Sequence, residues 1–322
     1  LTSERQIKQG TIVKIPISYI KPELVSGISH PSVNKLAEES EKKSKGREEL
    51  KNIVVILDPG HGGRDVGASQ KIKHVFEDEL NYDIAIRVMK YLQEHTSARV
   101  YLTLRDNSRG FEVYNGSRFE IDEDEVILVT PPYKPREKDG SANLRWILAN
   151  SIMRRNEAIG IPKENMVFIS IHFDSLPPSY RGTRVLCPPP PPRKEIEYPK
   201  SNIIKFESFA EWRDNKPRIL NASEKIKDKE CSHRFAHIFI SNLKKNNIVI
   251  YNMGDPIQEI INRSPKSTYV PAVLRNTEIP TKVLIESANL KNDKDLSNVT
   301  NPEWRQKFAE ALAKSIIAYF SK

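Results

Sequence analysis

Only two cysteines occur in the 322 residues of this chain, and their spacing is not that of a metal-binding or redox pair. Cys187 and Cys231 lie outside any CxxC motif, which excludes a cysteine-based zinc finger and a thioredoxin-type site. They are expected either to pair in an oxidising compartment or to remain buried thiols. No run approaches the ~20 apolar residues of a membrane-spanning helix, so we predict no membrane span.

Apolar residues are also scarce, at 38% of the chain, whereas charged residues make up 29%. This balance predicts a modest core surrounded by polar, partly irregular segments. The formal net charge of +9 favours anionic partners, but the basic residues alternate with acidic ones and no aromatic-rich RNA-binding motif accompanies them. We therefore expect a solvated surface and no nucleic-acid partner.

The length of the chain favours one enlarged domain behind a short leader. Residues 1–51 are predicted to form a leader and linker, partly irregular, and residues 52–322 the domain. Two stretches rich in proline, glycine and mixed charge, at about residues 107–140 and 188–229, are predicted to be insertions. Because the chain begins at Leu1 and not at Met, an export signal could have been removed before this numbering begins.

Apolar runs alternate with helical patterns along the domain. Residues 53–57 and 166–171 are continuous apolar runs, as expected of strands buried on both faces. A helical pattern over residues 81–95 joins the first run to a strand at residues 99–104, and this β-α-β order predicts parallel pairing. Further strands and helices are predicted at residues 181–187, 281–285, 142–159, 231–245 and 302–320. The fold class is therefore α/β: a single, mostly parallel twisted sheet flanked by helices (phosphorylase/hydrolase-like), with two long insertions.

Four polar side chains are predicted to meet at one edge of this sheet. His61, His172 and Glu286 each follow a predicted strand, and Glu77 precedes the first helix. Loops at the carboxyl ends of parallel strands usually carry the ligand site. Two histidines and a carboxylate are the usual three ligands of a catalytic Zn²⁺, with the fourth position left to water. Glu286 would be the neighbouring carboxylate that shuttles protons.

Each of these residues also has a purely structural explanation. His61 lies in a glycine-rich turn, and acidic residues such as Glu77 are favoured at helix starts whatever their function. His172 follows an apolar run, where hydrogen-bonded core histidines are common, and Glu286 could be a surface charge at a strand end. The prediction of a metal site therefore depends on the joint placement of the four.

Five strings in the chain resemble motifs of the zinc-dependent N-acetylmuramoyl-L-alanine amidases, the amidase type 3 family. Residues 54–68 (VVILDPGHGGRDVGA) are similar to its opening motif, and residues 77–81 (EDELN) and 168–175 (FISIHFDS) to its second and third zinc-ligand motifs. Residues 283–290 (VLIESANL) resemble its catalytic-glutamate motif, and residues 273–277 (VLRNT) a string before the last strand. Several motifs in the same order are far more specific than a lone pair of histidines.

The resemblance implies particular roles for residues of this chain. Glu77, four residues before Asn81, is the implied metal ligand in place of Glu79. Glu286 is the implied general base, and Arg275 is implied to help organise the site. The implied reaction is zinc-dependent hydrolysis of the amide between N-acetylmuramic acid and L-alanine in peptidoglycan, in cell-wall remodelling, division or autolysis.

The resemblance also implies the setting in which the protein works. We expect a monomer in the cell envelope, periplasmic or secreted, with peptidoglycan as its partner. Some family members carry a helix that covers the zinc until an activator protein removes it, and residues 193–229 are a candidate for such a lid. A decorative surface loop is the alternative. Two other functions stay open: a different zinc peptidase or deacylase, and a non-catalytic peptidoglycan-binding protein on the same fold.

Overall fold

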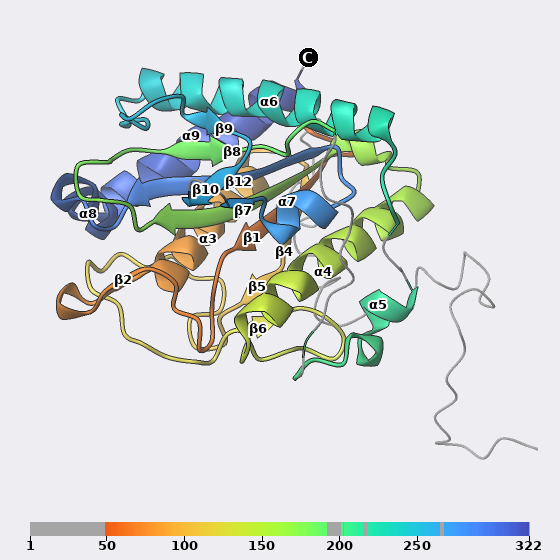
Figure 1. The fold of residues 1–322 in the computed structure, drawn as a ribbon, viewed down its shortest axis with the longest axis horizontal. Coiled ribbons are helices and arrows are strands. Elements are labelled where there is room, and N and C mark those ends of the chain that lie inside the picture. The colour runs from red at the N-terminus through yellow and green to blue at the C-terminus, as the bar shows by residue number, and fades with distance from the viewer. Residues whose placement is uncertain (1–48, 192–200, 202, 215–217, 265–266, 322) are drawn as a thin grey trace, which may run out of the picture.

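A six-stranded sheet forms the centre of the computed structural model, which describes residues 49–191, 201, 203–214, 218–264 and 267–321 (Figure 1). The strand order is β4-β1-β7-β12-β8-β9. β1 pairs in parallel with β4 and β7, and β12 pairs in parallel with β7, whereas β8 runs antiparallel to β12. The strands are β1 (Val54–Pro59), β4 (Arg99–Leu102), β7 (Met166–Asp174), β8 (Arg184–Leu186), β9 (Ile257–Gln258) and β12 (Thr281–Asn289).

Helices cover both faces of this sheet. In Figure 1, α4 crosses the front of the sheet next to α7, and α6 runs along its upper side. α3 and α6 both pack against α9. The α-helices are α3 (Glu77–His95), α4 (Lys138–Ala158), α5 (Ala210–Asp214), α6 (Ala222–Lys245), α7 (Ala272–Asn276), α8 (Asp293–Thr300) and α9 (Pro302–Phe320). Small two-stranded sheets pair β2 (Ser69–Gln70) with β3 (Val75–Phe76), β5 (Leu104–Arg105) with β6 (Val126–Ile127), and β10 (Ile261–Ser264) with β11 (Ser267–Tyr269).

The predicted fold class is confirmed: the sheet is mostly parallel and lies between helices. Every residue of β1 is buried, as a strand covered on both faces requires. Asn301 caps the last helix, because its side chain accepts a hydrogen bond from the backbone of Glu303. Among the described helices, none is both long and apolar enough to cross a bilayer.

The central strands continue further than their apolar runs predict. β7 includes His172 and ends at Asp174, and β12 includes Glu286 and ends at Asn289. The pairing explains the extension, because Glu286 stands opposite His172 in the parallel ladder of the two strands. The prediction that these two residues lie just beyond their strands was therefore wrong. Both project from the rigid sheet.

Both predicted insertions end earlier than expected. α4 already begins at Lys138, inside the predicted insertion 107–140, and α6 begins at Ala222, inside 188–229. Asn221 and Glu224 form a reciprocal capping box that fixes the start of α6. The first turns of both helices carry no apolar stripe, so their composition is that of an insertion.

Three other predictions meet the structure only in part. The strand expected over residues 181–187 is shorter and is β8 alone. Cys187 is buried and Cys231 is partly buried, and both are free thiols. The leader, apart from a turn at residues 49–51, lies outside the described residues, as do residues 192–200 of the second insertion.

Candidate metal centre

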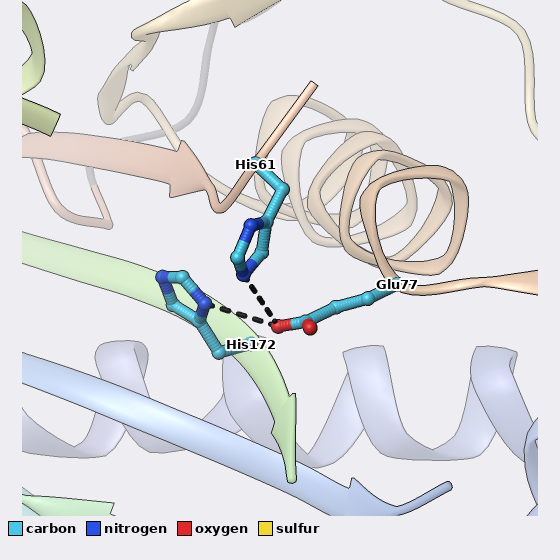
Figure 2. Close-up of side chains that lie close together, drawn as sticks. All are labelled: His61, Glu77 and His172. Carbon is cyan, nitrogen blue, oxygen red and sulfur yellow. Dashed lines mark hydrogen bonds and ion pairs between the residues drawn. The ribbon is translucent and has the colours of Figure 1, made fainter. Parts of the chain in front are cut away.

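His61, Glu77 and His172 meet beyond the carboxyl end of β1 (Figure 2). The Nε2 atom of His61 and the Nδ1 atom of His172 each lie 3.1 Å from the same oxygen, Oε1 of Glu77. The two imidazole rings meet edge to face, with centroids 5.0 Å apart. The structure thus brings together three side chains that are far apart in sequence.

Each of the three side chains is held by a different element. His61 lies in the loop that follows β1 and has a positive φ of 65°, which non-glycine residues rarely adopt. Glu77 is the first residue of α3, and not a loop residue before it. Its Oε1 accepts a hydrogen bond from the backbone N–H of Phe173 (3.0 Å) and its Oε2 one from that of Ala68 (2.6 Å). The carboxylate is therefore fixed between the loop and β7.

This arrangement attracts a cation. Burial alone would lower the pKa of His61, but Glu77 and Asp65 together raise it to about 10. Burial would raise the pKa of Glu77, but His61 and His172 hold it well below its usual range. Asp65 lies 3.0 Å from Nδ1 of His61, on the far side of the ring from Glu77. Such a carboxylate behind an imidazole is the usual support of a metal-ligating histidine.

The spacing of the three donor atoms fits a zinc ion. Bonds of about 2.0–2.2 Å in a tetrahedron separate neighbouring ligand atoms by roughly 3.3–3.6 Å. The two nitrogen-to-oxygen distances are 3.1 Å, and all three donor atoms lie within 4.8 Å of one another. Two imidazole nitrogens and one carboxylate oxygen are also the donor types that Zn²⁺ prefers. The residues present therefore fit the metal that the sequence predicts.

Glu286 lies beside this cluster with one oxygen unused. It lines the same cavity as His61 and His172, and its Oε2 is buried without a hydrogen-bond partner among the described residues. Burial, together with the negative charges of Asp174 and Glu77, raises the pKa of Glu286 well above its usual value. A carboxyl group with a raised pKa is suited to accept a proton and return it.

Arg145, which the sequence reasoning missed, ties the metal loop to the sheet. Its guanidinium donates to Asp58 (2.7 Å) and to the backbone carbonyls of Pro59 and His61. Asp58 is fully buried and also accepts hydrogen bonds from Thr103 (2.5 Å) and Ser170 (2.7 Å). Arg145 therefore stabilises the backbone on both sides of Gly60. Arg145 lies one turn into a predicted helix, and nothing in the neighbouring sequence indicates that its side chain contacts the loop of His61.

Replacing Arg145 by lysine is expected to weaken zinc binding by about 10–100-fold, the usual cost of losing support behind a metal ligand. A lysine ammonium lacks the planar fork that reaches Asp58 and two carbonyls together. Zinc affinity would be measured by competition with a chromophoric chelator, at a temperature where circular dichroism shows the variant folded. The exposed Arg118 provides the control, Arg118→Lys. Equal affinity in both variants would show that Arg145 does not position the loop.

Gly67 lies against two of the predicted ligands. A Cβ atom there would stand 2.5 Å from Oε2 of Glu77 and 2.7 Å from the ring of His61. Its φ of 65° adds strain for any other residue. Gly110 is a matched control, because its φ is 61° but a Cβ there would meet nothing within 4 Å.

Alanine at either glycine should cost roughly 1–2 kcal/mol of stability through the left-handed backbone. Only Gly67→Ala should also weaken zinc binding, because only there does the methyl group displace Glu77 and His61. Thermal unfolding and zinc titration of both variants test this expectation. Equal zinc affinity for the two would contradict the packing described for Gly67.

Two further candidates lie away from the three side chains. Arg275 is on α7 and is not among the described residues that line the cavity, so the structure gives no contact that supports its predicted role. Glu79 belongs to a second acidic cluster with Asp122 and Glu125. There it pairs with Arg109, as the interpretation of Glu79 as a structural charge requires.

The described part of the second insertion packs against residues 130–133 and against the start of α4, where the Ser201 hydroxyl donates a hydrogen bond to Glu137. The backbone N–H of Ala210 bonds to the carbonyl of Thr130 (2.9 Å), and the Glu211 carboxylate accepts hydrogen bonds from the backbone and hydroxyl of Thr130 (2.8 and 3.0 Å). The ring of Phe209 lies against that of Tyr133. Between residues 201 and 229, no described residue lines the cavity of about 190 Å³ at the metal centre. The described part of the predicted lid therefore does not cover the site.

The fold and the site together define a candidate metallohydrolase: two imidazoles, a buried carboxylate and a second carboxylate, with one oxygen that has no partner among the described residues, at the end of a mostly parallel sheet. Comparison with known proteins gives the family. The model of the Amidase_3 family, described as N-acetylmuramoyl-L-alanine amidase, matches residues 55–318. The chain therefore belongs to this family.

Curated relatives agree with this assignment. The chain is 23% identical over 277 residues to the N-acetylmuramoyl-L-alanine amidase AmiC of Escherichia coli, and 23% identical over 273 residues to an uncharacterized cell wall amidase of Bacillus anthracis. Each match covers 84% of this chain, but only 53% and 36% of the respective relative. The chain thus spans about half or less of the length of these relatives.

A solved structure shows the same fold. The N-acetylmuramyl-L-alanine amidase Ami1 of Mycobacterium smegmatis superposes with a TM-score of 0.50 at 21% sequence identity. The match covers 85% of this chain and 99% of Ami1.

Proposed function

We propose that this chain is a zinc-dependent amidase that hydrolyses the bond between the lactyl group of N-acetylmuramic acid and L-alanine in peptidoglycan. The family match supports the substrate and the reaction. The single observation that carries the mechanism is the meeting of His61, Glu77 and His172 next to a cavity that both histidines share with Glu286, whose Oε2 has no hydrogen-bond partner among the described residues. A purely structural role explains each residue alone, but it does not explain this meeting.

In this mechanism His61 Nε2, His172 Nδ1 and Glu77 Oε1 would hold the zinc ion. When bound, zinc polarises the scissile carbonyl and makes water a better nucleophile near neutral pH. Glu286 takes a proton from the attacking water at its unpaired Oε2 and then gives a proton to the departing alanine nitrogen. Asp65, whose Oδ2 lies 3.0 Å from Nδ1 of His61, would support the His61 ring from the side away from the metal. Arg145 keeps the loop of His61 in place.

The proposed substrate sets the place of action. We propose that the protein works in the cell envelope, periplasmic or secreted, in remodelling, division or autolysis of the wall. The predicted monomer stays a prediction. An activator protein that displaces residues 193–229 also stays a prediction. The described residues of this segment contact the start of α4 and residues 130–133, and none of them lines the cavity.

Digestion of purified muropeptides tests the proposal against its alternatives. We expect mass spectrometry to show a free stem peptide that begins with L-alanine, together with the intact sugar. A carboxypeptidase would shorten the stem from its other end, and a deacylase would release acetate. A protein that only binds the wall would sediment with peptidoglycan and release nothing. Any of these three results would contradict the proposed reaction.

A further inference from the structure

One wall of the metal-site cavity comes from the first two turns of α4. Lys138, Ser141, Ala142 and Arg145 all line the cavity, and their spacing places them on one face of the helix. Arg145 directs its guanidinium to Asp58 and to two backbone carbonyls. The proposed reaction therefore leaves Lys138 and Ser141 as polar groups of this wall without a role.

Ser141 presents an unused hydroxyl to the cavity. Its side chain is only 6% exposed, and its Oγ is buried without a hydrogen-bond partner among the described residues. A helical serine commonly bonds back to the carbonyl four residues earlier, as Ser315 does to Ala311 (2.6 Å), but the Ser141 hydroxyl makes no such bond among the described residues. A buried hydroxyl without a partner is costly, so a bound molecule that supplies an acceptor would be favoured.

Lys138 places a positive charge at the same wall. It is the first residue of α4, a 21-residue helix whose N-cap side chain makes no capping hydrogen bond, so the positive end of the helix lies there. The ammonium is 3.9 Å from one oxygen of Asp65, and the other oxygen of Asp65 is 3.0 Å from Nδ1 of His61. One side chain thus separates the cation from the metal ligands. Its 70% exposure leaves it accessible to a ligand.

A cation, a hydroxyl donor and a helix N-terminus are together suited to a carboxylate. We propose that Lys138, Ser141 and the N-terminus of α4 bind the α-carboxylate of the second residue of the stem peptide, the residue that follows the scissile alanine. This inference rests on the proposed function. An extended peptide advances about 3.3–3.6 Å per residue, so this carboxylate lies roughly 7 Å from the bond to be cut. Lys138 lies 3.9 Å from Asp65, which lies 3.0 Å from His61, so the proposed subsite begins one side chain away from the metal ligands.

Two muramyl peptides that differ only in having a carboxylate or a carboxamide at this position test the subsite. Their dissociation constants would be measured by calorimetry on zinc-loaded Glu286→Ala protein, which is expected to bind without cutting. We expect the carboxylate peptide to bind about 10-fold more tightly, as one charge-assisted hydrogen bond allows. In the wild-type enzyme the same preference should appear in KM, with kcat little changed, because the contact is made equally in the ground and transition states.

Substitution of the two side chains should remove the preference. Lys138→Gln and Ser141→Ala should bring the ratio of the two affinities close to one, whereas Ser141→Thr, which keeps the hydroxyl, should restore it. Lys134→Gln, at an exposed lysine that does not line the cavity, should keep the wild-type ratio. The failures are distinguishable. Cleavage of both peptides without preference would overturn the subsite, and a binding preference without cleavage would overturn the proposed reaction instead.

Discussion

Glu286→Ala is expected to lower turnover of muramyl peptides by about 10²–10⁴-fold, the usual contribution of a positioned general acid and base. Glu286 projects from β12 beside His172, and its Oε2 is buried with no partner among the described residues. Without this carboxylate, solvent has to accept the proton of the attacking water and to supply the proton that the leaving nitrogen needs. The three predicted ligands remain in place, so the variant should still bind zinc at one equivalent.

Two measurements on the same sample separate this role from a structural one. Zinc content by atomic spectroscopy should match that of the wild type, while the rate of stem-peptide release falls. Glu94→Gln provides a control, because Glu94 is an exposed glutamate near the end of α3. Full activity of Glu286→Ala would refute the assigned role. Loss of zinc together with activity would instead make Glu286 part of the metal site.

His61→Ala and His172→Ala are expected to lose the metal itself. Each change removes one of the nitrogens that lie 3.1 Å from Oε1 of Glu77. Loss of a supporting group behind a ligand already costs about 10–100-fold in metal affinity, so loss of a ligand should cost more. Activity should disappear with the metal, and added zinc should restore it only at concentrations far above those that saturate the wild type.

The exposed His95, at the last turn of α3, serves as the matched control. Zinc titrations of His61→Ala, His172→Ala and His95→Ala, each confirmed as folded by circular dichroism, compare the three sites directly. We expect wild-type affinity in His95→Ala alone. Wild-type affinity in either of the other two variants would mean that the histidine concerned is not a ligand.

The fold was predictable because its strands have a simple hydrophobic pattern. The apolar runs before Asp58 and His172 belong to strands buried on both faces, and helical spacing between strands implied parallel pairing. Strand ends were less predictable. The backbone ladder continues through polar residues such as Asp58 and His172 because their partners on the neighbouring strand are in register, and this is a tertiary property.

The candidate site was likewise predictable in part. The joint placement of His61, Glu77, His172 and Glu286 was predicted from strand ends and motif order, and the structure brings the four side chains to one place. The supporting groups were not predicted. Arg145 approaches the loop of His61 from 84 residues away, and only the fold creates that contact.

Shorter contacts also escaped detection. Asp65, four residues after His61, lies in the opening motif, but nothing in the sequence indicated a role for it. Only the position of the His61 ring in the structure shows that Asp65 supports this histidine. Ser141 looked like an ordinary helical serine, because the sequence does not reveal that its hydroxyl is buried at a cavity with no partner in the described part of the chain. Polar residues in helices carry no periodic signal that separates solvent contacts from site contacts.

A crystal of the zinc-loaded protein, with diffraction recorded on both sides of the zinc absorption edge, tests the metal centre most directly. We predict one anomalous peak within bonding distance of His61 Nε2, His172 Nδ1 and Glu77 Oε1, with the Glu286 carboxylate near the ion but not bound to it. A peak at other residues, or none here in protein that contains one equivalent of zinc, would contradict the account.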